Sequence, residues 1–527
     1  MAIDNASLSP NLSRRMAAAK PVAASDGGVI VTQNRKASEV GLDVLRRGGN
    51  AVDAAVAASF AVGVVEPWMS GIGGVGAMLV RPAGSQEVTA VNFGPRAPRR
   101  LEPSHFPVVG GADEDLFGWP KVEGNRNIVG ASAVAVPAVP AGIWAAHRRF
   151  GTRPWHELVG PAAELAEEGL QVDWWTLIEI SSTFADLARD PGCRALFLPA
   201  GAPPVPPAVA SGLPPVRLRN EALARTLRQI ADEGAKGFYE GRIARALASS
   251  VAAAGGYLAE DDLASVEPLV TPAATLDYRS HRVNVVPLLN GGPTLLEAMT
   301  TLAGNWRAKG ARPDGAALAA YVDALQPAWR RRLTELGDVS PTETSTTHLA
   351  VIDRQGNTVS LTQTLLSIFG SRFLEPETGI LLNNGINWFD PRPGRPNSMA
   401  PGKRGLANYT PTILTGPDDV VALGGSGGRK IMPAVFNLAS FIVDYGMSTE
   451  EAMSAPRLNV SGPEEVVLDR AFPEDVVAEL AARHEVTLAD RTCYPLNFTV
   501  GAIARRQGRR NEAVAELWHP TAEALGE

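Results

Sequence analysis

The sequence predicts a layered fold of sheets and helices, of class α/β or α+β, on three observations. Two alternating runs, 347–353 and 358–365, flank Arg354-Gln355-Gly356, which is typical of a β-hairpin. Other segments carry apolar residues at helical spacing, namely 36–47, 51–64, 141–150, 155–168 and parts of 220–254. Of the 527 residues, 45% are hydrophobic and 20% are charged, which suits a globular protein with a sizeable core.

Turn and cap residues support the first elements. Gly48-Gly49 suits the end of one helix, and Asn50 can cap the next. A glycine-rich loop then leads into strands near 77–81 and 88–93, joined by a turn at Gly84-Ser85. Near the C-terminal end, 420–423 is predicted as a strand, 424–428 as a turn and 429–445 as a helix. Pro-rich 199–215 is predicted as a surface loop.

Composition excludes several classes of function. The formal charge of -7 argues against a surface that follows nucleic-acid phosphates. The two cysteines, Cys193 and Cys493, allow one disulfide at most. None of the seven histidines forms a close ligand pair, so neither a metal nor another cofactor is expected.

The sequence gives little indication of a secretory signal or of a membrane-spanning segment. The most apolar stretch, 51–65, contains Asp53 and is too short to span a bilayer. Residues 1–25 lack the apolar region of a secretory signal and are predicted to form a loose arm. We therefore expect a cytoplasmic protein without a membrane partner.

Two glycine motifs suggest competing chemistries. Gly71-Ile-Gly-Gly-Val-Gly76 matches a dinucleotide-binding pattern, but it follows a helix and opens a strand, so a close-packed structural loop is favoured. Gly424-Gly-Ser-Gly-Gly428 matches a serine nucleophile elbow at Ser426, and Asp444 and His484 follow in the required order. The same glycines also suit an oxyanion hole built from backbone N–H groups.

The hairpin suggests a third chemistry. Centring its turn on Gln355 places Thr346 opposite Thr364, with both side chains on one face. Cleavage before Thr346 would give a terminal threonine that carries a hydroxyl nucleophile and an α-amino base. On the residues alone, this hypothesis ranks below the serine elbow.

Several separate motifs resemble the γ-glutamyltransferase family, in order from about residue 28 to 510. They are Gly48-Gly-Asn-Ala-Val-Asp-Ala-Ala-Val-Ala57, Val65-Glu-Pro-Trp-Met-Ser-Gly-Ile-Gly-Gly74, Thr346-Thr-His348, Gly379-Ile-Leu-Leu-Asn-Asn384, Asp444-Tyr-Gly446 and Ala455-Pro-Arg457. The resemblance implies an α+β fold, the four-layer αββα sandwich of N-terminal-nucleophile hydrolases. It also implies a proenzyme.

The resemblance assigns roles to particular residues. It implies a cut between Ser345 and Thr346, which would leave residues 1–345 as a large subunit and 346–527 as a small catalytic one. Length alone suggests three or four domains, whereas the two subunits would form one structural domain. Thr346 would be the nucleophile and Thr364 the second threonine. Gly427 and Gly428 would hold the oxyanion.

The sequence departs from the family where glutamyl substrates bind. The family's carboxylate-binding arginine is Gly94 here, and Arg96 lies two residues later in Phe93-Gly-Pro-Arg-Ala-Pro98. The segment 396–403 is too short for the usual lid loop. The other departures are Leu366 for an asparagine, Gly385 and Trp388 for a glutamine and an aspartate, and Ala407-Asn408 for a serine pair. A smaller, more apolar pocket is expected, in which Arg96, Leu366, Gly385, Trp388 and Asn408 contact substrate.

These departures resemble oxamate amidohydrolases and cephalosporin or glutaryl acylases. We therefore predict a self-processing N-terminal-threonine amidohydrolase that acts on a small acidic acyl amide, with water or an amine as acceptor. Two processed heterodimers could associate. The alternatives are a γ-glutamyltransferase or glutathione hydrolase with an altered pocket, a serine hydrolase that uses Ser426, and a non-enzymatic relic of the family.

Overall fold

Two antiparallel sheets of seven strands each form the centre of the protein. The computed structural model describes residues 3–4, 18–112, 119–208, 211–336, 346–492 and 498–527. The first sheet has the order β10 (Leu269–Pro272), β5 (Thr89–Phe93), β4 (Val75–Arg81), β14 (Thr358–Thr364), β13 (Thr347–Ile352), β3 (Val29–Thr32) and β24 (Glu523–Gly526). The second has the order β11 (Ala274–Tyr278), β12 (His281–Val285), β17 (Thr412–Thr415), β18 (Asp419–Ser426), β22 (Val500–Gln507), β23 (Arg510–Ala515) and β2 (Ala23–Ser25).

The sheets pack face to face through small side chains. Val29 and Val31 of β3, with Ala350 and Ile352 of β13, meet a set of alanines from β18, β22, β23 and β24. A hydrogen bond from the Ser360 hydroxyl to the Leu423 carbonyl, 2.9 Å long, also joins the sheets. Small residues allow this close approach of two backbones.

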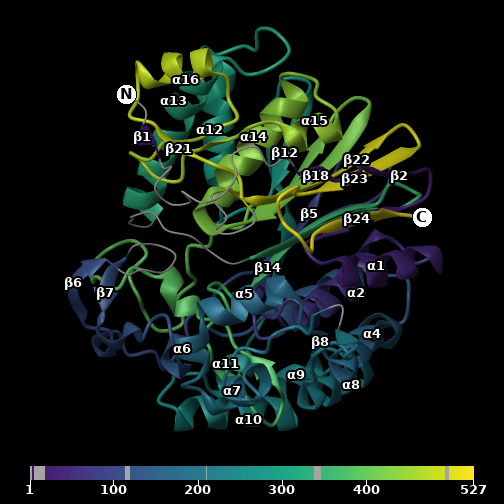
Figure 1. Ribbon diagram of the computed structural model, residues 1–527, viewed down its shortest axis with the longest axis vertical. Helices are drawn as coiled ribbons and strands as arrows, with labels where there is room; N and C mark the ends of the chain where they lie inside the picture. Colours follow the sequence, from purple (N-terminus) through teal and green to yellow (C-terminus); the bar gives the residue numbers. More distant parts are fainter. Residues whose placement is uncertain (1–2, 5–17, 113–118, 209–210, 337–345, 493–497) are drawn as a thin grey trace.

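Helices cover the outer face of each sheet (Figure 1). The first sheet packs on α1 (Arg35–Arg46), α2 (Ala51–Val65) and α3 (Val139–Phe150), behind which lie α4 (Trp155–Glu168), α8 (Glu221–Glu233), α9 (Lys236–Tyr239) and α10 (Gly241–Ala253). The second packs on α12 (Gly292–Asn305), α13 (Gly315–Arg331), α14 (Ile431–Val443) and α15 (Thr449–Ser454). The architecture is the expected α+β sandwich with four layers, αββα.

Smaller elements surround this sandwich. A four-stranded sheet has the order β1 (Ile3–Asp4), β21 (Thr487–Ala489), β20 (Val467–Asp469) and β19 (Leu458–Asn459), and α16 (Glu474–Ala481) contacts α13. Three two-stranded pairs are β6 (Val108–Ala112) with β7 (Pro120–Val122), β8 (Leu170–Gln171) with β9 (Arg217–Leu218), and β15 (Leu374–Glu375) with β16 (Ile380–Leu381). Short helices α5 (Trp174–Ser182), α6 (Phe184–Leu187), α7 (Pro191–Phe197) and α11 (Glu260–Ala264) complete the chain.

Local sequence signals predicted the early elements well. The Asn50 side chain accepts hydrogen bonds from the N–H groups of Val52 and Asp53, and the Asp53 carboxylate accepts one from the Asn50 N–H, so α2 begins with a capping box. Helix α1 begins at Arg35, one residue before its predicted start, after an Asn34 cap.

Two local predictions were wrong. Part of the predicted loose arm is bound, because β2 pairs with β23 and the Lys20 ammonium donates to the Ala522 carbonyl at 2.6 Å. The strand predicted at 420–423 continues to Ser426, since the pairing with β22 extends from Asp419 to Ser426. Residues 1–2 and 5–17 of the arm lie outside the described residues.

Candidate active site

Thr346 and Thr364 lie side by side at one end of the first sheet. In the β13–β14 pair Thr347 is opposite Gln363, so Thr346 is opposite Thr364 and the predicted register is confirmed. The two hydroxyl oxygens are 3.4 Å apart, and both residues are buried. Ser345, the other residue of the predicted cleavage site, lies outside the described residues.

The turn after β14 holds the Thr364 hydroxyl in place. Its oxygen accepts a 2.7 Å hydrogen bond from the Leu366 N–H. Leu366 has a φ of +88°, a left-handed conformation that a leucine adopts only when its surroundings compensate. Asn384 supplies part of that support, because its side chain accepts from the Ser367 N–H and donates to the Ser367 hydroxyl. Asn384 of the Asn383-Asn384 motif thus supports the turn that holds Thr364.

The glycine-rich loop 71–76 packs against this end of β14. It follows α2 and opens β4, as predicted for a structural loop. A Cβ on Gly74 would lie 2.3 Å from the Thr364 carbonyl oxygen, so only glycine allows this approach. Asn383 secures the loop by donating to the Gly73 carbonyl at 2.7 Å. The motif therefore positions Thr364 through its backbone.

The second glycine motif ends β18 in the second sheet, where it lies against β13, the strand that follows Thr346. A Cβ on Gly424 would lie 2.1 Å from His348, two residues after Thr346. Gly427 and Gly428 both have positive φ, +128° and +59°, and lead into a short 3-10 helix, Gly428–Lys430, before α14. This conformation suits glycines whose N–H groups could face an anion.

The serine triad suggested by the motif is not assembled. The Ser426 hydroxyl accepts a 2.6 Å hydrogen bond from the Gln33 side chain. Asp444 instead accepts from Tyr278 at 2.5 Å and from Arg279 at 3.0 Å. The nearest carboxylate of the described residues to His484 is Asp323, at 3.9 Å. The serine-elbow alternative is therefore wrong, because three residues in the right order fold to three different places.

His348 shares the face of Thr346 but is not a base. Its Nδ1 lies 2.9 Å from the Thr362 hydroxyl, and burial lowers the pKa of the imidazole to about 3. A group that resists protonation this strongly stays neutral during turnover at neutral pH. If a general base acts on Thr346, it must come from elsewhere.

Most of the predicted pocket residues are buried in the core of the protein. Leu366, Trp388, Ala407 and Tyr409 are buried in one hydrophobic cluster. Gly385 allows the Trp388 ring to lie close, since a Cβ there would be 3.0 Å from it. Arg96 is partly exposed, and its Nε donates to the Gly402 carbonyl at 3.2 Å.

A buried arginine that sequence reasoning missed orients Asn408. Arg332 donates to the Asn408 side-chain oxygen at 3.0 Å and to the Ala407 carbonyl at 2.5 Å. Burial lowers the pKa of this guanidinium to about 9. The run Arg330-Arg-Arg332 carries no sequence signal that distinguishes the buried member from its neighbours.

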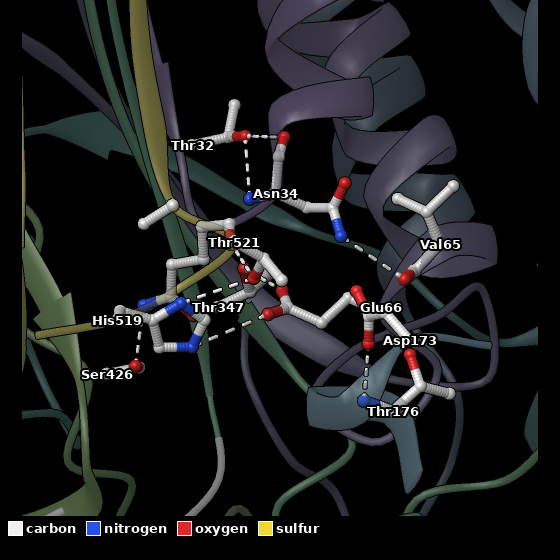
Figure 2. A network of polar contacts seen from close by, with 12 residues as sticks. Thr32, Asn34, Val65, Glu66, Asp173, Thr176, Thr347, Ser426, His519 and Thr521 are labelled. Carbon is white, nitrogen blue, oxygen red and sulfur yellow. Dashed lines mark hydrogen bonds and ion pairs between the residues drawn. The ribbon is translucent and has the colours of Figure 1, made fainter. Parts of the chain in front are cut away.

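A second buried polar group lies beside β13, the strand that follows Thr346. Figure 2 shows Glu66, Thr347 and His519 converging from α2's end, β13 and the C-terminal segment. The Thr347 hydroxyl donates to Glu66 at 3.0 Å, and the other Glu66 oxygen lies 3.9 Å from the His519 Nε2. Burial raises the pKa of Glu66 to about 8, and Glu179 adds to the rise. Burial lowers the pKa of His519 to about 3.

Glu66 makes stability fall as the pH rises. The pKa of Glu66 is higher in the folded protein than in the unfolded chain. Its contribution to the free energy of unfolding is therefore complete below pH 4.5 and is lost by about pH 8. We expect Glu66→Gln, which keeps an acceptor for Thr347, to remove a loss of about 1 kcal/mol per pH unit in that window. Urea unfolding of wild type and variant at pH 5, 6, 7 and 8 measures this difference.

A matched control separates this effect from general titration. Glu87 is exposed on the β4–β5 turn, so Glu87→Gln should follow the wild-type pH profile. Burial also raises the pKa of Glu179 to about 8, and because its charge acts on Glu66, Glu66→Gln removes this interaction as well. Parallel profiles for wild type and Glu66→Gln would contradict the prediction.

Other features of the described residues bear on cofactors and membranes. They hold no group of three or more histidine, cysteine, aspartate or glutamate side chains that could bind a metal ion. No helix among them is long and apolar enough to cross a bilayer. Cys193 is a buried free thiol, and Cys493 lies outside the described residues.

The family model for gamma-glutamyltranspeptidase matches residues 37–344 and 339–525, which is nearly the whole chain. The chain belongs to this family. It is 33% identical to the acylase ACY 1 proenzyme of Pseudomonas sp. (strain SE83), over 91% of this chain and 90% of that protein. It is 30% identical to the glutathione hydrolase proenzyme of Bacillus subtilis (strain 168), over 88% and 85%.

A solved structure confirms the fold. Cephalosporin acylase from Bacillus halodurans superposes with a TM-score of 0.83 at 24% identity, covering 98% of both chains. The four-layer sandwich is thus the N-terminal-nucleophile hydrolase fold, as expected. Family membership makes this chain an enzyme that acts on amide bonds.

Proposed function

We propose that the chain cuts itself between Ser345 and Thr346 and then hydrolyses the amide of a small acidic acyl compound through Thr346. The observation that carries this proposal is the pair of buried hydroxyls, Thr346 and Thr364, 3.4 Å apart at the start of β13. The names of two relatives as proenzymes support the processing step. Residues 1–345 and 346–527 would then be the two subunits, and each sheet contains strands from both.

The geometry supports a two-step mechanism. After processing, the Thr346 α-amino group titrates near about 7.7–8.0 and can accept the hydroxyl proton. The Thr346 oxygen attacks the carbonyl carbon, and the amine leaves with that proton as the C–N bond breaks. Water then hydrolyses the acyl-threonine ester, which restores the hydroxyl and releases the acid. Backbone N–H groups of Gly427 and Gly428 would stabilise the oxyanion.

The pocket favours an acyl group that lacks the α-amino group of a glutamyl substrate. Leu366 and Trp388 are apolar where the family has polar groups, and a site that lacks polar partners cannot discriminate in favour of a polar substrate. We place Asn408 and Gly385 beside these two side chains as further substrate contacts. Arg96 remains the cationic candidate that the sequence indicated.

A comparison of p-nitroanilides tests the substrate class. We expect glutaryl-p-nitroanilide to have a kcat/KM at least about tenfold above that of γ-glutamyl-p-nitroanilide. The reason is that the α-amino group of the glutamyl compound has no polar partner in an apolar pocket. Released nitroaniline is followed by absorbance. Preference for the glutamyl compound would instead favour a glutathione hydrolase, the activity that the Bacillus subtilis relative is named for.

A further inference from the structure

Glu66 and His519 face each other in the buried network beside β13 (Figure 2). Glu66 Oε1 and His519 Nε2 are 3.9 Å apart, and neither atom has a hydrogen-bond partner among the described residues. Both side chains are completely buried. Because unpaired polar atoms are unfavourable in a protein interior, these two atoms are expected to bond each other if one of them carries a proton.

The hydrogen bonds of Thr521 determine the tautomer of His519. The Thr521 hydroxyl donates its single hydrogen to the Gln33 carbonyl at 2.8 Å, so its oxygen can only accept from His519 Nδ1, which is 3.3 Å away. Nδ1 therefore carries the hydrogen of the ring. Because burial lowers the pKa of His519 to about 3, the ring is neutral, and Nε2 is an unprotonated acceptor that faces Glu66.

The contacts of Glu66 place its proton on the oxygen that faces His519. The other oxygen, Oε2, accepts from the Thr347 hydroxyl at 3.0 Å, as the carbonyl oxygen of a carboxylic acid can. Burial, with a contribution from Glu179, raises the pKa of Glu66 to about 8, so Glu66 is a neutral acid at pH 7. A proton on Oε1 then faces Nε2, and a shift of about 1 Å gives a hydrogen bond of normal length.

Thr347 connects this pair to the nucleophile. Thr347 follows Thr346 at the start of β13, and the two side chains point to opposite faces because side chains alternate along a strand. A cut before Thr346 would make that residue a chain end, and chain ends are poorly ordered unless other groups hold them. The bond from Thr347 to Glu66 supplies a side-chain restraint one residue from the nucleophile.

We propose that Glu66 and His519 are positioning residues for Thr346. The Glu66 acid donates to His519 Nε2 and accepts from Thr347, so one shared proton holds the start of β13 in place. Loss of that proton would set a carboxylate oxygen against the lone pair of Nε2 and push the two side chains apart. This inference rests on the proposed function of Thr346 as the nucleophile.

The charged and titratable groups around the pair leave its proton in place at pH 7. They are Lys20 of the N-terminal arm, Asp173 and Glu179 at α5, Arg457 before β19 and Glu516 after β23. Glu516 pairs with Arg457, and the Lys20 ammonium donates to the His519 carbonyl. Asp173 caps α5 by accepting from the Thr176 N–H. Burial raises the pKa of Glu179 to about 8, so it too is a neutral acid at pH 7.

Three variants test the hydrogen-bond pattern at pH 7, with glutaryl-p-nitroanilide as substrate. Glu66→Leu removes both bonds, and His519→Phe keeps the ring contact with Trp175 but lacks Nε2. We expect each to lower kcat about tenfold with little change in KM, since the nucleophile is misplaced while the pocket is intact. Glu66→Gln offers an oxygen to Thr347 and an N–H to His519, so it should restore most of the kcat that Glu66→Leu loses. Equal losses in the two Glu66 variants would overturn the inference, and thermal unfolding checks that each variant is folded.

The pH profile is a readout that a purely structural role would not change. The Thr346 α-amino group must be neutral to act as base, so kcat should rise through about pH 7.7–8.0. In wild type the loss of the Glu66 proton near pH 8 should make kcat fall again, whereas Glu66→Gln should reach a plateau. At pH 9.5 we expect Glu66→Gln to be about tenfold faster than wild type. Glu87→Gln, on an exposed turn, should keep the bell-shaped profile, and a plateau in wild type would overturn the inference.

Nitrogen-15 NMR of the histidine rings separates this inference from the proposed function, because it requires no turnover. The His519 signals, identified by their loss in His519→Phe, should show a protonated Nδ1 and an unprotonated Nε2 at pH 7. The Nε2 shift should change near pH 8 in wild type and stay constant in Glu66→Gln. A protonated Nε2 at pH 7 would overturn the inference even in an active enzyme. The expected tautomer in a protein that cuts neither itself nor an amide would instead refute the proposed function.

Discussion

Replacing Thr346 with alanine is expected to leave one uncut chain without amidase activity. The substitution removes the hydroxyl that lies opposite Thr364, and with it the proposed nucleophile for both cleavage and turnover. Loss of a covalent nucleophile lowers kcat by about 10⁴-fold or more. A denaturing gel and intact mass should show a single species for Thr346→Ala. Wild type should show two, with the smaller one beginning Thr346-Thr347-His348.

Two further variants sharpen this experiment. Thr334→Ala changes an exposed threonine of the π-helix Arg332–Leu336, whose hydroxyl donates to the Arg330 carbonyl, and it should be processed like wild type. Ser426→Ala should also still be cut, because the Ser426 hydroxyl accepts from the Gln33 side chain and makes no other side-chain hydrogen bond among the described residues. Processing of Thr346→Ala, or a wild type that is active while intact, would refute the N-terminal-threonine mechanism.

Replacing Thr364 with valine is expected to slow self-cleavage and turnover without unfolding the protein. Valine has nearly the same shape but lacks the oxygen that accepts from the Leu366 N–H and from the Thr346 hydroxyl. Leaving these buried donors unpaired costs about 1–3 kcal/mol each, and we expect about 1.4–4 kcal/mol of that total to fall on the transition state, which slows the rate about 10- to 1000-fold. The rate at which the fragments appear after rapid purification measures it.

The control lies on the same strand and face. The Thr358 hydroxyl donates to the Gly356 carbonyl at the far end of β14, so Thr358→Val should cost stability but leave the cleavage rate within about threefold. If Thr364→Val is cut and turns over as fast as Thr358→Val, Thr364 has no part in orienting the nucleophile.

Local patterns predicted the hairpin and the helix caps because neighbouring residues determine them. Alternation over 347–353 and 358–365, with Gly356 in the turn, gave the register in which Thr347 is opposite Gln363. Asn50 satisfies the N–H groups of its own helix, so its role needs no distant partner.

Motifs without their surroundings were less informative. Ser426, Asp444 and His484 have the order of a triad, yet Asp444 bonds Tyr278 and Arg279 instead. The sequence predicts a turn at Gly424 and Gly425, but both pair with β22 and so belong to β18. At Gly424, His348 fills the space that a side chain would need. Tertiary pairing overrides the local turn preference there.

By itself the sequence determined the family, the layered α+β class, and the place of Thr346 beside Thr364, since short-range pattern and motif order carry that information. Only the tertiary structure decided which groups surround them. Glu66 meets Thr347 across 281 positions of the chain, and Tyr409 fills the space at Gly94. Burial sets the charge of Glu66 and leaves the Tyr409 hydroxyl unpaired, and burial depends on segments that are distant in the sequence.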